Sequence, residues 1–277
     1  MLVLAVATCA SMTAQTVFVH ANVFNGTRLL RNQTLVTEGG IITGLGGKLA
    51  HPPNAQIIDC KGKTLLPALI DAVAEARNAG WVQIDYDDGF AWGDRHPPVS
   101  FEALHDEVEA AHKERKRVLI SVGSLRESTE ALKAEADGLL RIFAGAQSDP
   151  AFVKLAARRK VFIIPMVAAL EGAVLKGGKP RREGSLETLR QLHKAHVPML
   201  AGGALAEELE LLVRDVGMTP IQALQSATSL PARLFGLKDR GTIAVGKRAE
   251  LLLVNGDPTV SITVLTQPVK QAGSRAF

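Results

Sequence analysis

Two hydrophobic patterns divide the chain. Between Thr16 and Lys63, β-branched and other apolar residues form short runs that are separated by glycines and by the pair Asn25-Gly26. Short alternating runs with such turn residues predict small antiparallel sheets. The segment from Arg240 to Val254 returns to the same strand-like pattern. We therefore expect β structure in both outer parts of the chain, on either side of a different kind of segment.

The middle of the chain, from Leu65 to Leu237, alternates short apolar runs with amphipathic ones. Strands are expected at TLLPALIDA, VQIDYDDG, RVLISVG, LLRIFAG, VFIIPMV and VPMLAGG. Helices are expected at SFEALHDEVEAAHKERK, STEALKAEA, DPAFVKLAARRK, SLETLRQLHKA, AEELELLVRDVG and TPIQALQSATSLPARLFGL, with Ser100 as the cap of the first. Apolar strands that alternate with helices are typical of βα units, and they predict the α/β class with a parallel sheet.

Composition agrees with a folded protein and excludes several classes. Hydrophobic residues make up 47% of the 277 positions and charged residues 22%, which excludes a disordered or highly charged tail protein. The net charge is +4, but Lys and Arg are scattered and aromatic residues are only 4%. A nucleic-acid-binding protein would cluster the former and stack bases on the latter, so no nucleic-acid partner is expected. Cys9 and Cys60 lack the spacing of a disulfide framework or a structural zinc site.

Residues 1–15 form a candidate signal peptide. The apolar run from Met1 to Ala14 is too short to span a bilayer, so no integral membrane segment is expected. It resembles the apolar region of a secretory signal, with small residues near Ala14, and the alternative is a buried first strand. A signal would place the protein in the periplasm or outside the cell; otherwise it would be cytoplasmic.

Three stretches carry a resemblance to a known family. They are Asp59–Ala72 (DCKGKTLLPALIDA), Ala227–Leu237 (ATSLPARLFGL) and Asp239–Pro258 (DRGTIAVGKRAELLLVNGDP). With these in order, the chain resembles the amidohydrolase superfamily, in its imidazolonepropionase- and prolidase-like branch. The resemblance implies a TIM-barrel-like (β/α) domain over residues 65–237 and a composite β-sandwich built from residues 16–64 and 238–277.

The barrel segment is short for that fold. From Leu66 to Arg233 it holds about six βα strands, whereas a complete eight-stranded barrel takes roughly 200 residues at the least. The shortfall lies between Ala76 and Val82. We therefore expect an incomplete barrel, and an open parallel sheet would expose strand edges. Dimerisation, irregular closure of the barrel, or an unrecognised contribution from residues 78–95 would each cover those exposed strand edges.

The resemblance also implies a divalent metal, zinc or another, at the C-terminal mouth of the barrel. Histidines and carboxylates would hold it, and it would lower the pKa of a bound water for attack on an amide or related bond. The chain departs from that ligand pattern at each position that we can align. The residues that stand there are Val73, Glu75, Gln83, Ser121, Arg141 and Ala204. We therefore expect a degenerate metal site, no bound cofactor and no catalytic residue of the family type.

An acidic run offers an alternative metal site. Asp85, Asp87 and Asp88, together with Asp94, Asp71 and Glu75, carry the oxygen ligands that Mg²⁺ and Ca²⁺ prefer. The other interpretation is a solvated loop at the end of a strand, which is the commoner use of such residues.

The histidines and one basic loop favour structural roles. His105 and His112 lie seven residues apart and share a helix face, where a solvent-facing pair is expected. His193 and His196 lie at a helix end, where cationic side chains suit the helix dipole, and His96 precedes two prolines in a loop. The loop at residues 176–182 could meet an anion, but a solvated loop is the simpler interpretation.

Three functional hypotheses follow. The first is a degenerate amidohydrolase relative that binds an unknown small molecule or serves as a scaffold without catalysis. The second is a hydrolase that acts on carbon–nitrogen bonds, of the non-peptide or dipeptide amide kind, through a relocated metal site. The third is a structural homo-oligomer whose strand edges pair between chains. Because function depends on the site rather than on the fold, the resemblance alone does not decide among them.

Overall fold

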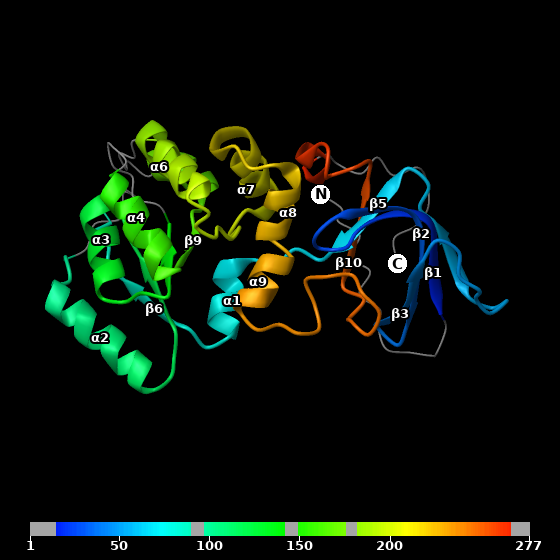
Figure 1. Ribbon diagram of the computed structural model, residues 1–277, viewed down its shortest axis with the longest axis horizontal. Helices are drawn as coiled ribbons and strands as arrows, with labels where there is room; N and C mark the ends of the chain where they lie inside the picture. Colours follow the sequence, from blue (N-terminus) through cyan, green and yellow to red (C-terminus); the bar gives the residue numbers. More distant parts are fainter. Residues whose placement is uncertain (1–14, 90–96, 142–148, 176–181, 267–277) are drawn as a thin grey trace. The chain divides into compact units, whose positions relative to one another are not determined.

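The computed structural model describes residues 15–89, 97–141, 149–175 and 182–266. The chain divides into two compact units (Figure 1). The β-sheet unit holds the residues up to Ile70 together with those from Pro220 onward, and the α/β unit holds Asp71–Thr219. The candidate signal peptide lies almost wholly outside the described residues.

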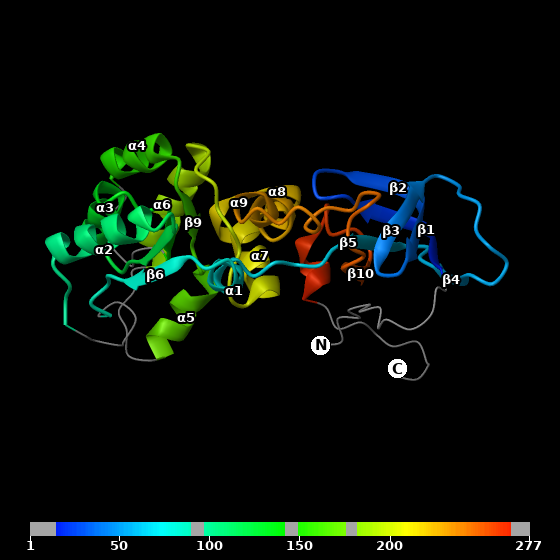
Figure 2. The ribbon, with the colours of Figure 1, turned by 90° about the horizontal axis from the view of Figure 1, so that it is seen from below.

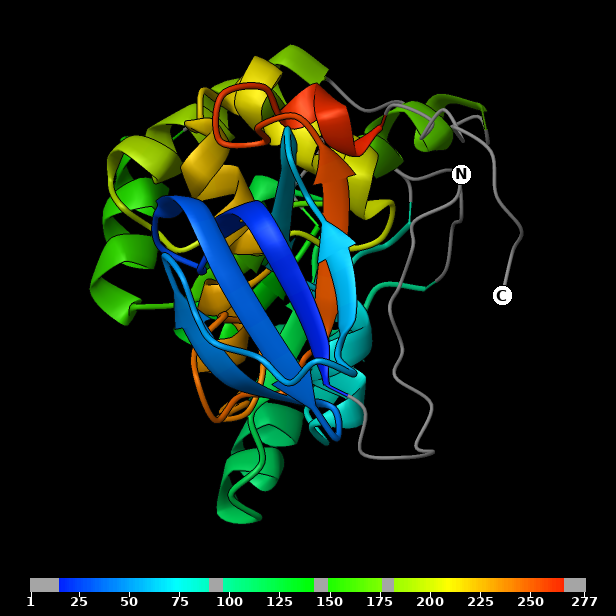
Figure 3. The same cartoon turned by 90° about the vertical axis from the view of Figure 1, so that its right-hand side faces the viewer.

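The β-sheet unit is built from both outer parts of the chain. Its sheet has the order β10-β5-β1-β2-β3, and β4 also pairs with β1. The strands are β1 (Thr16–Phe24), β2 (Leu29–Glu38), β3 (Ile41–Gly46), β4 (Gln56–Asp59), β5 (Lys63–Pro67) and β10 (Leu251–Asn255). Figure 3 shows β10 and β5 side by side. In the register of this antiparallel pair, Leu253 lies opposite Leu65. Its apolar core joins residues such as Phe18 and Leu35 to Ile243 and Leu251, which matches the expected composite of two distant segments.

One expected barrel strand belongs to this sheet instead. The run TLLPALIDA was expected to open the barrel, but its strand, β5, pairs antiparallel with β10 and parallel with β1. Leu65 and Leu66 are fully buried in this setting. A continuous apolar run shows that a strand is buried on both faces, but it does not show which sheet the strand joins.

The boundaries between the units differ from the expected ones after residues 64 and 237. They fall after Ile70 and before Pro220, so that α8 (Pro220–Ser226) and α9 (Ser229–Leu234) lie with the β-sheet unit. Hydrogen bonds explain why: the Ile70 N–H donates to the Ala227 carbonyl at 2.7 Å, and the Ser229 hydroxyl donates to the Gly26 carbonyl at 2.6 Å. These helices follow the βα rhythm in sequence, but their partners are residues of the β-sheet unit.

The α/β unit contains an open parallel sheet of order β6-β7-β8-β9. Its strands are β6 (Val82–Asp85), β7 (Val118–Ser121), β8 (Gly138–Leu140) and β9 (Phe162–Ile164). Its helices are α1 (Ala72–Asn78), α2 (Phe101–Lys113), α3 (Leu125–Lys133), α4 (Pro150–Arg159), α5 (Val167–Leu175), α6 (Arg182–Lys194) and α7 (Leu205–Leu211), which continues as a π-helical turn. Figure 2 shows α1 leading into β6. The α/β class and the parallel sheet are confirmed, and in the described residues the barrel is not closed.

The last expected strand, VPMLAGG, is reduced to a single bridge between Met199 and Ile163. The Ile163 N–H donates to the Pro198 carbonyl at 2.9 Å, and the Leu200 N–H donates to the Ile163 carbonyl at 2.8 Å. Pro198 has no N–H to donate, and Gly202 and Gly203 follow almost at once, so the ladder does not extend. Beyond β9, the sheet therefore continues only as this single bridge between Met199 and Ile163.

Helix ends in this unit follow local sequence signals. Ser100 accepts from the Ala103 N–H at 3.2 Å, as expected for the cap of α2, and Ser124 and Asp149 cap α3 and α4 in the same way. Helix α5 is a correction, because its first residue, Val167, was expected to end the strand VFIIPMV. None of the helices in the described ranges combines the length and apolar character needed to cross a membrane.

Candidate functional site

The carboxyl ends of β6, β7 and β8 place polar side chains together. In a parallel sheet these ends share one edge, where the loops that build active sites begin. Asp85 pairs with Ser121, and Ser121 with Leu140, so the residues that follow β6 and β8 flank the end of β7. The side chains that meet at this edge are those of Asp87, Ser121 and Arg141.

Asp87 is the centre of this cluster. Its side chain is 2% exposed, whereas that of Arg141 is 35% exposed. One carboxylate oxygen accepts from the Gly89 N–H at 2.8 Å. The other accepts from the Ser121 hydroxyl at 3.0 Å and from Arg141 Nη1 at 3.4 Å. A buried carboxylate needs hydrogen bonds and a compensating positive charge, and these donors supply both.

The backbone at this edge adopts uncommon conformations. Arg141, Met166 and Gly203 have φ of 68°, 52° and 76°. Arg141 and Met166 are not glycines, and a residue with a Cβ is strained in the left-handed backbone conformation. At Arg141 the strain is held by its N–H, which donates to the Ile164 carbonyl at 2.8 Å. The turn after β8 thus brings the guanidinium toward Asp87.

Tyr86 fixes the segment that carries Asp87. The Tyr86 hydroxyl donates to Glu130 Oε2 at 2.8 Å, and Arg126 Nη1 donates to the same oxygen at 2.6 Å. Burial and the Glu130 carboxylate raise the pKa of Tyr86 to about 12, so the phenol remains a donor at neutral pH. The end of β6 is therefore anchored to α3.

Three further carboxylates of the α/β unit bind backbone N–H groups of this chain. Asp71 accepts from Val73, Ala74 and Gly203, and Glu127 accepts from Gly123 at 2.9 Å. Glu208 is fully buried and accepts from Val167 and Ala168, both at 2.9 Å, at the start of α5. Burial raises the pKa of Glu208 to about 7, although its backbone hydrogen bonds oppose that shift. All three carboxylates thus hold loops and helix starts in place.

The six positions at which the resemblance implies ligands differ in what their side chains offer a metal. Val73 and Ala204 offer no ligand atom, and the charge of Arg141 repels a cation. A Cβ on Gly202 would meet methyl groups of Val73 and Ile164, both at 2.8 Å, so apolar atoms crowd this point. Gln83 accepts from Arg77 Nε at 3.3 Å, and its amide nitrogen is buried with no hydrogen-bond partner among the described residues. Glu75 lies on α1.

The residues of the alternative acidic site differ in their exposure. Asp87 is buried, whereas Asp85 and Asp88 are exposed. Within the described residues these carboxylates do not form a group of three ligand atoms close enough to share an ion. Among the described residues, His105, Asp106 and Glu109 on α2 do place three such ligand atoms close together. This group was missed from the sequence because histidines were compared only with each other. The sequence feature that could have indicated the group is the spacing of His105 and Glu109, which are four residues apart on a helix.

The other candidate side chains have structural partners. His112 Nε2 lies 3.0 Å from Asp137 Oδ2, which also accepts from the Val118 N–H at 2.8 Å. Burial, with a smaller effect from His196, lowers the pKa of His193. From the basic loop, Arg182 forms an ion pair with Asp215. Asp94, His96 and residues 176–181 lie outside the described part of the chain.

Comparison with known proteins identifies the family. A family model described as the amidohydrolase family matches residues 67–275, which is most of the chain. The chain belongs to the amidohydrolase family. The expected resemblance is therefore confirmed, with the α/β unit and the end of the β-sheet unit inside the matched range.

Curated members of the family match over shorter stretches. An imidazolonepropionase from Deinococcus deserti is 39% identical over 72 residues, which is 24% of this chain and 18% of that protein. Adenine deaminase 2 from Desulfotalea psychrophila is 42% identical over 57 residues, or 21% of this chain and 10% of that protein. These matches span less than a fifth of the length of each relative. They therefore agree with the family, but they do not show an activity for this chain.

Solved amidohydrolase structures match over nearly the whole chain. A putative prolidase from Bifidobacterium longum superposes with a TM-score of 0.73 at 18% identity, covering 96% of this chain and 97% of that chain. A Xaa-Pro dipeptidase with bound methionine in its active site gives a TM-score of 0.74 at 16% identity, covering 91% and 96%. At such identities the likeness shows the fold. The reaction depends on the residues at the site.

Proposed function

We propose that this amidohydrolase-family protein has a degenerate metal site and acts as a non-catalytic binding or scaffold protein. The observation that carries the proposal is the contact of Arg141 with Asp87 at the carboxyl edge of the parallel sheet, 3.4 Å from Nη1 to Oδ2. The Arg141 guanidinium and the buried Asp87 carboxylate thus pair with each other at this edge. In a metal-dependent hydrolase that edge would hold an ion and its activated water.

The chemistry of an arginine supports a binding role. A guanidinium stays protonated at any physiological pH, so it neither accepts a proton nor supplies a hydroxide. It does supply N–H donors in a planar fork that suits carboxylate and phosphate groups. Because the Arg141 side chain is 35% exposed, part of it faces solvent. We therefore expect the unknown small molecule to be an anion that contacts Arg141.

The carboxylates that bind backbone groups support the same conclusion. Asp71, Glu127 and Glu208 each accept from backbone N–H groups within the chain. Glu127 and Glu208 are buried, so a metal that displaced their donors would leave N–H groups buried and unpaired, which costs about 1–3 kcal/mol for each donor. Their hydrogen bonds thus favour a structural use of the acidic residues.

The test combines metal analysis with hydrolysis assays on the full chain. Protein purified without chelator or metal resin is analysed by elemental mass spectrometry, and dipeptides and cyclic amides are offered with and without added zinc. We expect no turnover in either case. We also expect Asp87→Asn to leave the metal content unchanged.

A contrary result would establish the second hypothesis. Zinc-dependent turnover, together with about one metal per chain that Asp87→Asn removes and Asp85→Asn leaves in place, would mean a metal centre rebuilt around Asp87. The carbon–nitrogen hydrolase would then replace the non-catalytic protein as the proposed function.

A further inference from the structure

Helix α2 brings three metal-ligating side chains together away from the sheet edge. His105, Asp106 and Glu109 each offer one ligand atom, and these atoms all lie within 4.8 Å of one another. All three side chains are exposed. The spacing explains the geometry, because residues three or four apart on a helix are neighbours on its surface. Glu109 lies four residues after His105 and three residues after Asp106, so it can approach both. The cluster is therefore set by α2 alone.

The imidazole of His105 has a fixed neighbour. The ring of Phe101, one turn earlier, lies 6.2 Å from the His105 ring, centre to centre. Contact between these rings restricts the rotamers of His105, so a smaller loss of conformational entropy accompanies ligand binding. Phe101 thus helps to hold the imidazole on the same side of α2 as Glu109.

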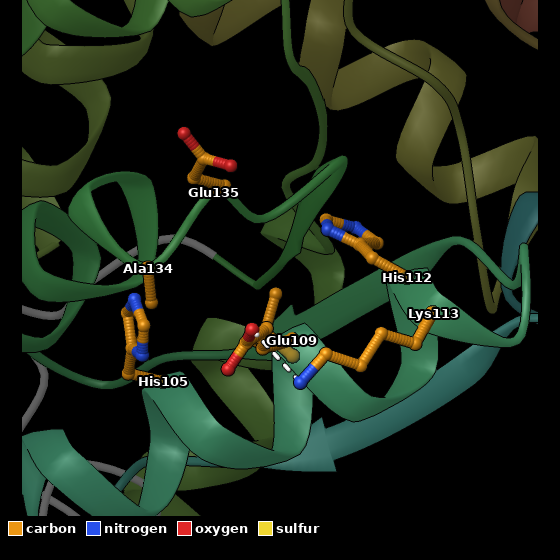
Figure 4. Close-up of a pocket in the computed structure, with 7 residues that line it drawn as sticks. His105, Glu109, His112, Lys113, Ala134 and Glu135 are labelled. Atoms are coloured by element: carbon orange, nitrogen blue, oxygen red, sulfur yellow. Dashed lines mark ion pairs between the residues drawn. The ribbon is translucent and has the colours of Figure 1, made fainter.

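A pocket of about 320 Å³ opens beside this cluster. Figure 4 shows His105 and Glu109 on α2, with Ala134 and Glu135 of the segment after α3 across from them. The wall is completed by Val108, His112 and Lys113. Two of the three cluster residues, His105 and Glu109, therefore border a hollow that has room for water molecules or a small ligand.

The carboxylate of Glu109 already attracts a cation. Lys113 Nζ lies 2.9 Å from Glu109 Oε1 (Figure 4). Any metal that binds Glu109 therefore competes with Lys113 for this carboxylate.

We propose that His105, Asp106 and Glu109 form a site for a divalent transition-metal cation of the zinc class at the rim of the α2 pocket. One imidazole and two carboxylates suit Zn²⁺ and its neighbours, whereas Mg²⁺ and Ca²⁺ prefer oxygen ligands alone. Three protein ligands leave the remaining coordination positions for water or a small molecule from the pocket. This site is separate from Asp87 and Arg141, and it does not rest on the proposed function.

The test is calorimetric titration of the metal-stripped full chain with zinc chloride. We expect one saturable site per chain that His105→Ala and Glu109→Gln each weaken at least tenfold. His51→Ala is the matched control, since His51 is an exposed histidine of the β-sheet unit, and it should leave binding unchanged. Lys113→Gln should tighten binding several-fold, because it frees the Glu109 carboxylate.

Two results would overturn the site. One is the absence of saturable binding at millimolar zinc, and the other is binding that His105→Ala leaves intact. Circular dichroism of each variant shows that α2 is still folded, so a loss of binding is not a loss of structure. Asp87→Asn should leave zinc binding on α2 unchanged, which separates this proposal from a rebuilt metal centre at the sheet edge.

Discussion

Arg141 and Asp87 form, at the scale of single residues, an ion pair between a partly exposed guanidinium and a buried carboxylate. The carboxylate is buried, and a guanidinium compensates its charge from the next strand but one. Such a pair adds modestly to stability when it is intact, but removal of one partner leaves a buried charge or donor without compensation. The residues at this edge therefore depend on each other.

Asp87→Asn tests that dependence. We expect the free energy of unfolding to fall by about 2 kcal/mol, less than for a fully buried pair because Arg141 is partly exposed. Urea unfolding measures it, and the exposed neighbour Asp85→Asn should change stability by less than about 0.5 kcal/mol. Equal effects of the two substitutions would mean that Asp87 is not the centre of the cluster.

Glu208 predicts a dependence of stability on pH. Its pKa is raised from 4.5 to about 7 in the folded chain, chiefly by burial. The protonated form is thus favoured by folding, so this contribution is fully present below about pH 4.5 and is lost as pH rises through about 7. Over that window the loss is on the order of 3 kcal/mol.

Glu208→Gln should remove this dependence, because the amide does not titrate. The measurement is the difference in unfolding free energy between about pH 5 and pH 8, which should shrink in Glu208→Gln relative to the wild type. The adjacent exposed residue supplies the control, Glu207→Gln, which should keep most of the wild-type difference, because the charge of Glu207 adds only a smaller effect to that of burial. A Glu208→Gln protein with the same pH profile as the wild type would contradict the raised pKa.

At the scale of elements, the end of β6 is tied to α3 through Tyr86 and Glu130. Tyr86 is the single tyrosine of the sequence, so its ionisation can be followed directly by ultraviolet absorbance. With a pKa of about 12, the phenolate should be absent at a pH where a free tyrosine is half ionised. Half ionisation near pH 10 in the folded protein would contradict the raised pKa that burial and the Glu130 hydrogen bond produce.

The pairing of β8 with β9 depends on Gly138. A Cβ at this position would meet the ring of Phe162 at 2.6 Å, and that ring also packs edge-on against Trp81 at 5.3 Å. Gly138→Ala should therefore lower the unfolding free energy by about 1–3 kcal/mol through overpacking. Gly47→Ala is a suitable control, since a Cβ at Gly47 would meet nothing within 4 Å. A Gly138→Ala protein as stable as the Gly47→Ala protein would show that the sheet accommodates the methyl group.

At the scale of the whole molecule, the family fold is held by strand pairing and charge pairing within the chain. If Arg141 rather than a metal balances Asp87, chelator should leave the melting temperature of the His105→Ala variant, in which the proposed α2 zinc site is weakened, unchanged. Differential scanning calorimetry of this variant with and without EDTA measures this. A fall of several degrees in the variant that added zinc reverses would instead indicate a structural metal at the sheet edge. The structural-oligomer hypothesis stays a prediction; a strictly concentration-independent monomer mass in sedimentation equilibrium would remove it.

Local patterns in the sequence predicted most of the elements. Ser100 marks the start of α2, and the apolar runs at β6, β7 and β9 mark buried parallel strands, because caps and hydrophobic periodicity act over a few residues. The cluster on α2 is also local, since its spacing alone places His105 and Glu109 on adjacent turns. Helix α5 was missed because the apolar residues around Met166 suit a strand or a buried helix equally well.

What the sequence determined by itself was the alternation of strands and helices, the composite of the two outer segments and the family. Only the tertiary structure decided which sheet β5 joins, because its partner β10 is distant along the chain and pairing depends on which edges are available. Only the tertiary structure brought Arg141 to Asp87, 54 residues apart. Contacts of that kind arise from strand order and loop conformation, and no local pattern encodes them.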